Sequence, residues 1–196
     1  MVKILRGLGL IVPLLILGAA HGATINFIAP AGLTGSQEVP PKETPALGTG
    51  SAQYDDVSLF LTVHLTWSGL LAPPGAAHIH CCPGPGVNGL VAVDFVPANF
   101  PSTTSGSFDH AFDLDAAASY GGDFLASFGG DVDAARDAVI AGLTDGLAYF
   151  NIHTPVNPGG EIRGDIVLAQ AQVPGPTALV LLALGLGVAA VRRRLG

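Results

Sequence analysis

Residues 147–167 read LAYFNIHTPVNPGGEIRGDIV. Two runs in which apolar and polar residues alternate flank the segment PVNPGG at residues 155–160, whose prolines and glycines favour a turn. A period of two is typical of β-strands, because successive side chains point to opposite faces of the sheet. The stretch therefore predicts a β-hairpin with a longer loop.

One face of this predicted hairpin is rich in polar side chains. Its apolar residues of one parity are Phe150, Ile152, Ile162 and Ile166. If these residues face the core, imidazole, amide, carboxylate and guanidinium groups share the opposite face. Those groups belong to His153, Asn151, Glu161 and Arg163. The segment AHIH at residues 77–80 repeats the arrangement, since Ile79 alternates with two histidines.

Further alternating runs predict an all-β fold. The clearest covers residues 57–67, where the residues of core parity are Leu59, Leu61, Val63, Leu65 and Trp67. Other strands are expected at residues 24–28, 76–80, 90–95 and 105–114, and residues 48–54 are expected to form a turn into an edge strand. Apolar residues at 132, 135, 139 and 143 have the spacing of an amphipathic helix, with Asp131 or Asp133 as its N-cap. The pattern predicts an antiparallel β-sandwich or barrel with one short helical insertion.

Both ends of the chain have the features of export and sorting segments. In residues 1–23, two basic residues precede an apolar run and then small residues, which indicates a signal peptide; an uncleaved membrane anchor is the alternative. After a linker at residues 169–172, the tail at 173–196 is apolar to Val191 and ends in three arginines. A helix over 173–191 would be about 28 Å long, close to the thickness of a bilayer core. We therefore expect a transmembrane helix there rather than a buried core helix, and one domain at residues 24–168.

The charge of the central domain restricts its partners. All fifteen acidic residues of the chain lie between residues 38 and 165, where only Lys42, Arg136 and Arg163 are basic, so this part carries a net charge of −12. Nucleic acid is excluded as a partner on this ground, because binding it requires basic side chains that neutralise phosphates. A divalent cation, a basic surface or solubility fits the charge better.

The only cysteines, Cys81 and Cys82, are adjacent. Neighbouring cysteines rarely meet the geometry of a disulfide with each other, so the sequence defines no disulfide framework. Two unpaired and partly buried thiols, a vicinal disulfide, intermolecular links, and soft metal ligands beside the histidines all remain open.

The sharpest chemical hypothesis is a metal site formed by His78, His80 and His153. Two histidines at positions i and i+2 of one strand can present both imidazoles to one ion, and a third from a neighbouring strand completes a three-nitrogen set suited to Cu or Zn. The alternative is that these histidines take part in a polar hydrogen-bond network with Asn151 and Glu161. Both interpretations place them on the polar face.

Four other residues are candidates for the polar face or for ligand binding: Glu38, Asn151, Glu161 and Arg163. For Glu161 and Arg163 a structural ion pair is the favoured interpretation, since alternate positions on one face can pair with neighbours across the sheet. Glu38 either caps a loop or approaches the polar face. The sequence has no GxSxG elbow, no HExxH motif and no phosphate-binding glycine loop followed by lysine, so catalysis has little support.

Several of these segments together resemble the CHRD domain, a module named for chordin. They are GLTGSQEVPP at residues 32–41, AHIH at 77–80, GLAYFNIHT at 146–154 and NPGGEIRG at 157–164. The resemblance covers about residues 24–168. It implies an immunoglobulin-like β-barrel distantly similar to copper/zinc superoxide dismutases, and no settled biochemical activity. Such a dismutase similarly uses a His-x-His strand for copper, but its bridging histidine and zinc loop have no counterpart that we can identify here.

The C-terminal tail is similar to the PEP-CTERM sorting signal, which an exosortase recognises and removes in bacteria that make extracellular polysaccharide. The matching residues are Val173, Pro174, Pro176, Arg192, Arg193 and Arg194, while Gly175 stands where the signal normally has glutamate. The resemblance implies as partners the export machinery, an exosortase-like enzyme, the inner membrane before processing, and an exopolysaccharide or matrix protein.

The sequence therefore predicts an exported, non-catalytic surface or matrix module that binds an unidentified ligand. The alternative is a copper- or zinc-binding metalloprotein built on His78, His80 and His153.

Overall fold

The computed structural model describes residues 22–169. The predicted signal peptide, except for its last two residues, and the predicted sorting tail lie outside these residues, and both stay predictions. Among the residues that the structure does describe, no helix is long and apolar enough to cross a membrane.

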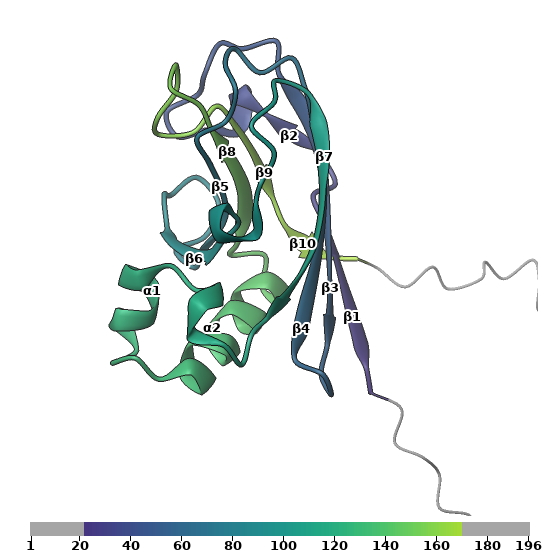
Figure 1. The fold of residues 1–196 in the computed structure, drawn as a ribbon, viewed down its shortest axis with the longest axis vertical. Helices are drawn as coiled ribbons and strands as arrows, with labels where there is room; N and C mark the ends of the chain where they lie inside the picture. Colours follow the sequence, from purple (N-terminus) through teal and green to yellow (C-terminus); the bar gives the residue numbers. More distant parts are fainter. Residues whose placement is uncertain (1–21, 170–196) are drawn as a thin grey trace, which may run out of the picture.

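The domain is built from antiparallel strands in two layers (Figure 1). The first layer contains β10 (Val167–Leu168), β1 (Thr24–Ile28), β3 (Leu47–Asp55), β4 (Phe60–Ser68) and β7 (Gly106–Asp113). The second contains β2 (Leu33–Thr34), β9 (Ile162–Asp165), β8 (Tyr149–His153), β5 (Ala76–Cys81) and β6 (Leu90–Asp94). This arrangement confirms the predicted all-β sandwich.

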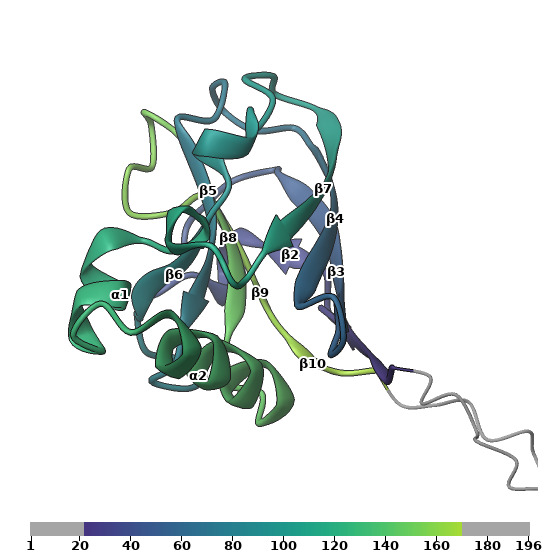
Figure 2. The same cartoon turned by 60° about the horizontal axis from the view of Figure 1, so that its bottom comes forward.

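A single long strand joins the two layers. Residues 51–55 of β3 pair with β1, whereas Leu47 and Gly48 at its start pair with β2. Because β3 pairs with a strand of each layer, the sheet folds over along β3. On the first layer β1 also pairs with β10. Both ends of the described domain consequently lie on the same side of the molecule, away from β5 and β8, separated along the length of β1 (Figures 1 and 2).

The predicted alternation of β4 is correct, but the strand begins later than expected. Leu61, Val63, Leu65 and Trp67 are buried, and the residues between them face outward. Leu59 is only partly buried and has a positive φ of 61°. It ends a turn in which Asp55 Oδ1 accepts hydrogen bonds from the amides of Val57 and Ser58 at 3.0 and 2.7 Å. Turn chemistry therefore overrides the apolar period at the start of this run.

The helical insertion covers one end of the sandwich (Figure 2). It contains a short helix, α1 (Gly122–Ser127), and the predicted helix, α2 (Val132–Thr144). Asp131 is the N-cap of α2, since its carboxylate accepts a hydrogen bond from the amide of Ala134 at 3.1 Å. Within residues 22–169, three short 3₁₀ helices complete the fold: η1 (Gly35–Gln37), η2 (Val96–Ala98) and η3 (Ala117–Ser119).

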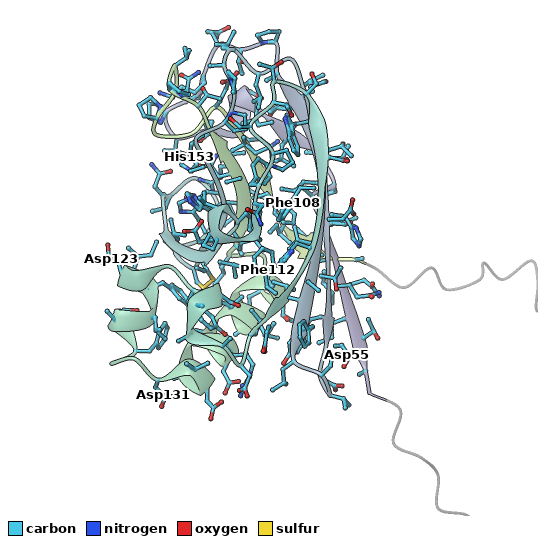
Figure 3. All side chains as sticks on the ribbon, viewed as in Figure 1. Asp55, Phe108, Phe112, Asp123, Asp131 and His153 are labelled. Carbon is cyan, nitrogen blue, oxygen red and sulfur yellow. A yellow bond between two sulfur atoms is a disulfide. The ribbon has the colours of Figure 1, made fainter. Side chains whose placement is uncertain are left out.

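Cys81 and Cys82 form a disulfide with each other, visible in Figure 3 as a yellow bond near α2. Cys81 is buried and alternates with His80 along β5, so it points to the core rather than to the histidines. The two sulfur atoms occupy the space that a side chain at Gly142 of α2 would fill: a Cβ atom there would lie 2.2 Å from Cys81 Sγ and 2.5 Å from Cys82 Sγ. The absence of a side chain at Gly142 thus permits the helix to dock on the disulfide.

This contact predicts that Gly142→Ala destabilises the domain. Alanine in a helix is favoured over glycine by about 1 kcal/mol, but overpacking a core costs about 1–3 kcal/mol and is expected to win here. Chemical denaturation should show a lower free energy of unfolding for Gly142→Ala. The matched control is Gly122→Ala, where a new Cβ meets nothing within 4 Å. Equal stability of the two variants would contradict the docking of α2 on the disulfide.

Candidate metal centre

Three histidines come together on the face of β5 and β8 that is opposite to the core. The two strands are antiparallel neighbours, with Ala76 opposite His153, His78 opposite Asn151 and His80 opposite Tyr149. Ile79, Phe150 and Ile152 are fully buried on the core side. Because side chains alternate along a strand, the anchoring of these apolar residues places all three histidines on the other side, as the sequence predicted.

The ring nitrogens of the three histidines are close enough to share one ion. His78 Nδ1 lies 3.2 Å from His153 Nε2, and His80 Nε2 lies 3.4 Å from the same atom. One nitrogen from each ring falls within 4.8 Å of the others. Two nitrogens bound tetrahedrally to an ion at about 2.0–2.1 Å would be about 3.3 Å apart. The two short distances therefore have the spacing of metal-bound imidazoles.

The opposite nitrogen of each ring faces a hydrogen-bond acceptor. His80 Nδ1 donates to the carbonyl oxygen of Gly89 at 2.9 Å, and His153 Nδ1 donates to that of Pro158 at 3.1 Å. His78 Nε2 faces Asp94 Oδ1 at 3.6 Å. The contact of His78 with Asp94 is too long for a hydrogen bond and assigns no proton. The two carbonyls place the ring protons of His80 and His153 on Nδ1 and leave Nε2 of each of these rings as a lone pair near His78 Nδ1. A shared cation would stabilise such an arrangement.

The environment keeps the three rings neutral, which is the form that binds metal. Burial lowers the pKa of His78 to about 3, with further contributions from the charges of His153 and His80. Burial also lowers the pKa of His80 to about 4. The pKa of His153 is lowered by the same cause. At pH 7 each ring is therefore uncharged and keeps one nitrogen without a proton.

The site is bordered by a cavity of about 470 Å³. His78 and Asp94 line it on the side of the strands, and Gly122 and Asp123 line it on the side of α1. Figure 3 labels His153 and Asp123 at the same side of the molecule. Asp94 was not singled out from the sequence, because its role depends on β6 lying beside β5.

The four other candidate residues lie in the interior. Glu38, Asn151, Glu161 and Arg163 are buried, with 4, 2, 0 and 0 % of their surface exposed. Glu38 approaches the polar face rather than capping its own loop: Asn151 Nδ2 donates to Glu38 Oε1 at 2.5 Å and to the Ile162 carbonyl at 3.0 Å. The loop that carries Glu38 thus covers the face that the parity argument identified.

Glu161 and Arg163 have different partners. Glu161 accepts hydrogen bonds from the hydroxyls of Thr44 and Thr154 and from the amide of Leu71, at 2.7, 2.6 and 2.9 Å. The sequence analysis favoured an ion pair for both residues, but in the described domain only Arg163 forms one, with Asp165 of its own strand, where Nη2 lies 2.9 Å from Oδ1. None of the three histidines hydrogen-bonds to Asn151 or Glu161 in the described domain, so the structure does not support the network proposed as the alternative to metal binding.

The structure places this protein in the class of antiparallel β-sandwich domains, with a cluster of three histidines on one face. Comparison with family models then gives the family. The model of the CHRD domain matches residues 29–166. The chain therefore belongs to the CHRD-domain family. No curated protein and no solved structure matches the chain.

The burial of Glu38 predicts a pH-dependent stability. Burial raises its pKa from 4.5 to about 7, against the lowering effects of Asn151 and Arg163. Below pH 4.5 the carboxyl is protonated in both folded and unfolded chains. As the pH rises to about 7, the unfolded chain loses this proton first, so Glu38 should progressively destabilise the fold by on the order of 3 kcal/mol.

Glu38→Gln should remove this effect, because a neutral amide resembles the protonated carboxyl. We expect the free energy of unfolding of Glu38→Gln, relative to the unchanged chain, to rise between pH 4.5 and 7 in urea titrations. The difference cancels the contributions of histidines, which are present in both proteins. A constant difference across this range would contradict a raised pKa at Glu38.

Proposed function

We propose that this chain is an exported CHRD-domain module that binds one copper or zinc ion through His78, His80 and His153. The observation that carries the proposal is the convergence of one nitrogen from each of three neutral rings, two of which are oriented by hydrogen bonds from the opposite nitrogen to main-chain carbonyls. Metal-binding histidines commonly have such partners, which set the tautomer and orient the ring. The net charge of −12 between residues 38 and 165 favours the approach of a cation.

Copper is the ion that this ligand set should hold most tightly. Imidazole nitrogens suit both Cu and Zn, and divalent copper binds nitrogen ligands more strongly than zinc does in the general order of affinities. Three protein ligands leave at least one coordination position for water or another small ligand. The proposal assigns the domain a binding role and derives no reaction from it.

The place where the protein works is also part of the proposal. The signal-peptide pattern in residues 1–23 and the resemblance of residues 173–196 to a PEP-CTERM signal support export, anchoring in the inner membrane, and processing by an exosortase-like enzyme. The surface or extracellular matrix would then be the final location, with an exopolysaccharide or matrix protein as neighbour. Membership of the CHRD family fits a non-catalytic module of this kind.

Metal content tests the proposed function directly. The purified full chain, loaded with Cu(II) or Zn(II) and then freed of weakly bound ions, should retain about one ion per chain by elemental analysis. The triple variant His78→Ala, His80→Ala, His153→Ala should retain none, because all three proposed ligands are gone. Circular dichroism should show that the variant keeps its β structure.

The chain also offers a matched control. His64 and His110 are exposed and lie outside the cluster, so the double variant His64→Ala, His110→Ala should bind the ion as the unchanged chain does. Loss of metal from this control as well would indicate adventitious surface binding. Absence of tightly bound metal in the unchanged chain would overturn the proposal.

A further inference from the structure

We propose that Tyr149 and Arg163 are positioning residues of the metal centre, which hold the His80 ring in one orientation and one tautomer. The inference rests on the proposed function for its consequence on metal binding. Its structural part, the single orientation and tautomer of the His80 ring, applies to the metal-free protein as well. Arg163 was considered from the sequence as a ligand-binding residue, but its complete burial directs its interactions to the protein interior.

The first link between Arg163 and His80 is a stack of three planar groups. The Arg163 guanidinium carbon lies 3.5 Å from the centre of the Tyr149 ring. The Tyr149 ring in turn stacks on the His80 ring, with centroids 4.9 Å apart and planes only 4° from parallel. A guanidinium over an aromatic face is a favourable contact, and it fixes the ring between two planes. Rotation of His80 would break the parallel contact with Tyr149.

The second link runs through the loop that ends at Gly89. Arg163 Nη1 donates to the carbonyl oxygen of Val87 at 3.2 Å. Two residues later, the Gly89 amide donates to Tyr149 Oη at 3.1 Å, and the Gly89 carbonyl accepts from His80 Nδ1 at 2.9 Å. The same peptide segment therefore contacts all three members of the stack. It holds the acceptor that keeps the His80 proton on Nδ1 and leaves Nε2 free for an ion.

Gly89 can occupy this place because it has no side chain. A Cβ atom there would lie 2.8 Å from the Cys81 carbonyl oxygen and 2.8 Å from Pro83 Cδ, too close for the loop to keep its path. The loop thus packs tightly against the end of β5. This tight packing fixes the position of the carbonyl that His80 uses.

The burial of Arg163 indicates why arginine rather than lysine stands at this position. A buried charge is costly unless it is paired, and Asp165 pairs with this one: Nε donates to Oδ1 at 3.0 Å. Nη2 lies 2.9 Å from the same oxygen but lacks the alignment of a hydrogen bond. Only a planar guanidinium can stack on Tyr149, reach Asp165 and donate to Val87 together. A lysine would retain the positive charge but would lack the planar group that stacks on Tyr149.

The metal-free full chain provides the first test. Long-range ¹H–¹⁵N NMR spectra of the histidine rings report which nitrogen carries the proton. In the unchanged chain His80 should be in the Nδ1–H form alone. Arg163→Lys and Tyr149→Leu should each give a mixture of the two tautomers, because the ring and its acceptor are no longer fixed. Tyr149→Phe keeps the stack and loses only the Oη acceptor, so it should stay closer to the unchanged chain.

Metal binding provides the second test. Competition titrations with Cu(II) should give an affinity about 10- to 100-fold lower for Arg163→Lys and Tyr149→Leu, the loss expected when groups that orient a metal ligand are removed. The electron paramagnetic resonance spectrum of the bound Cu(II) should change in both variants. The control is Tyr54→Leu, which removes a buried tyrosine from β3 in the other layer. It should lower stability without changing the His80 tautomer or the Cu(II) spectrum.

The outcomes separate the two proposals. If the unchanged chain binds no metal, the proposed function fails, and the tautomer of His80 still decides the positioning role. If His80 keeps a single tautomer in folded Arg163→Lys and Tyr149→Leu, the positioning role is overturned whether or not metal binds. Should Tyr149→Leu not fold, Arg163→Lys and Tyr149→Phe carry the comparison. A tautomer change in Tyr54→Leu would also overturn the role, because loss of stability alone would then explain the effect.

Discussion

The requirement that every buried charge have a partner governs this structure more than any other constraint. The hairpin β8–β9 places an amide, a carboxylate and a guanidinium where no water reaches them, and each would cost several kcal/mol if left unpaired. Distant loops supply the partners. Glu38 comes from the segment after η1, Thr44 from the approach to β3, and Val87 from the loop before β6. The covering loops are thereby fixed, and with them the carbonyls that orient the histidines.

The histidine cluster follows from this order. Its rings hydrogen-bond to main-chain carbonyls at Gly89 and Pro158, both in loops that the polar interior holds in place. Main-chain acceptors cannot adapt as flexible side chains do, so the rings of His80 and His153 are already held in one orientation. A site organised in this way would lose little conformational freedom if it bound an ion, which would favour affinity. The conformational entropy of ordering the rings is lost during folding, and the contacts that pair the buried polar groups offset it.

Local patterns in the sequence were sufficient to predict the parts of the site that depend on one strand at a time. The alternation of Ile79 with His78 and His80, and of Ile152 with His153, required only the period of a β-strand. The position of Glu38 and the pairing of Arg163 with Asp165 could not be chosen in the same way, because they depend on which loop covers the hairpin. Asp94 was missed for a similar reason. The packing of Cys81 and Cys82 could not be predicted either, because it involves Gly142, more than fifty residues away in sequence.

The pairing of β1 with β10 places the two ends of the domain on the same side of the sandwich, away from β5 and β8 (Figure 1). A membrane or surface anchor attached to either end would therefore apply its force to the same pair of strands, β1 and β10. The histidine-bearing strands are then presented outward, on the far side from the point of attachment. A molecule held on a surface in this way would offer the face that carries the histidines to the surrounding medium, and neither strand of that face would need to bear the mechanical load of the anchor.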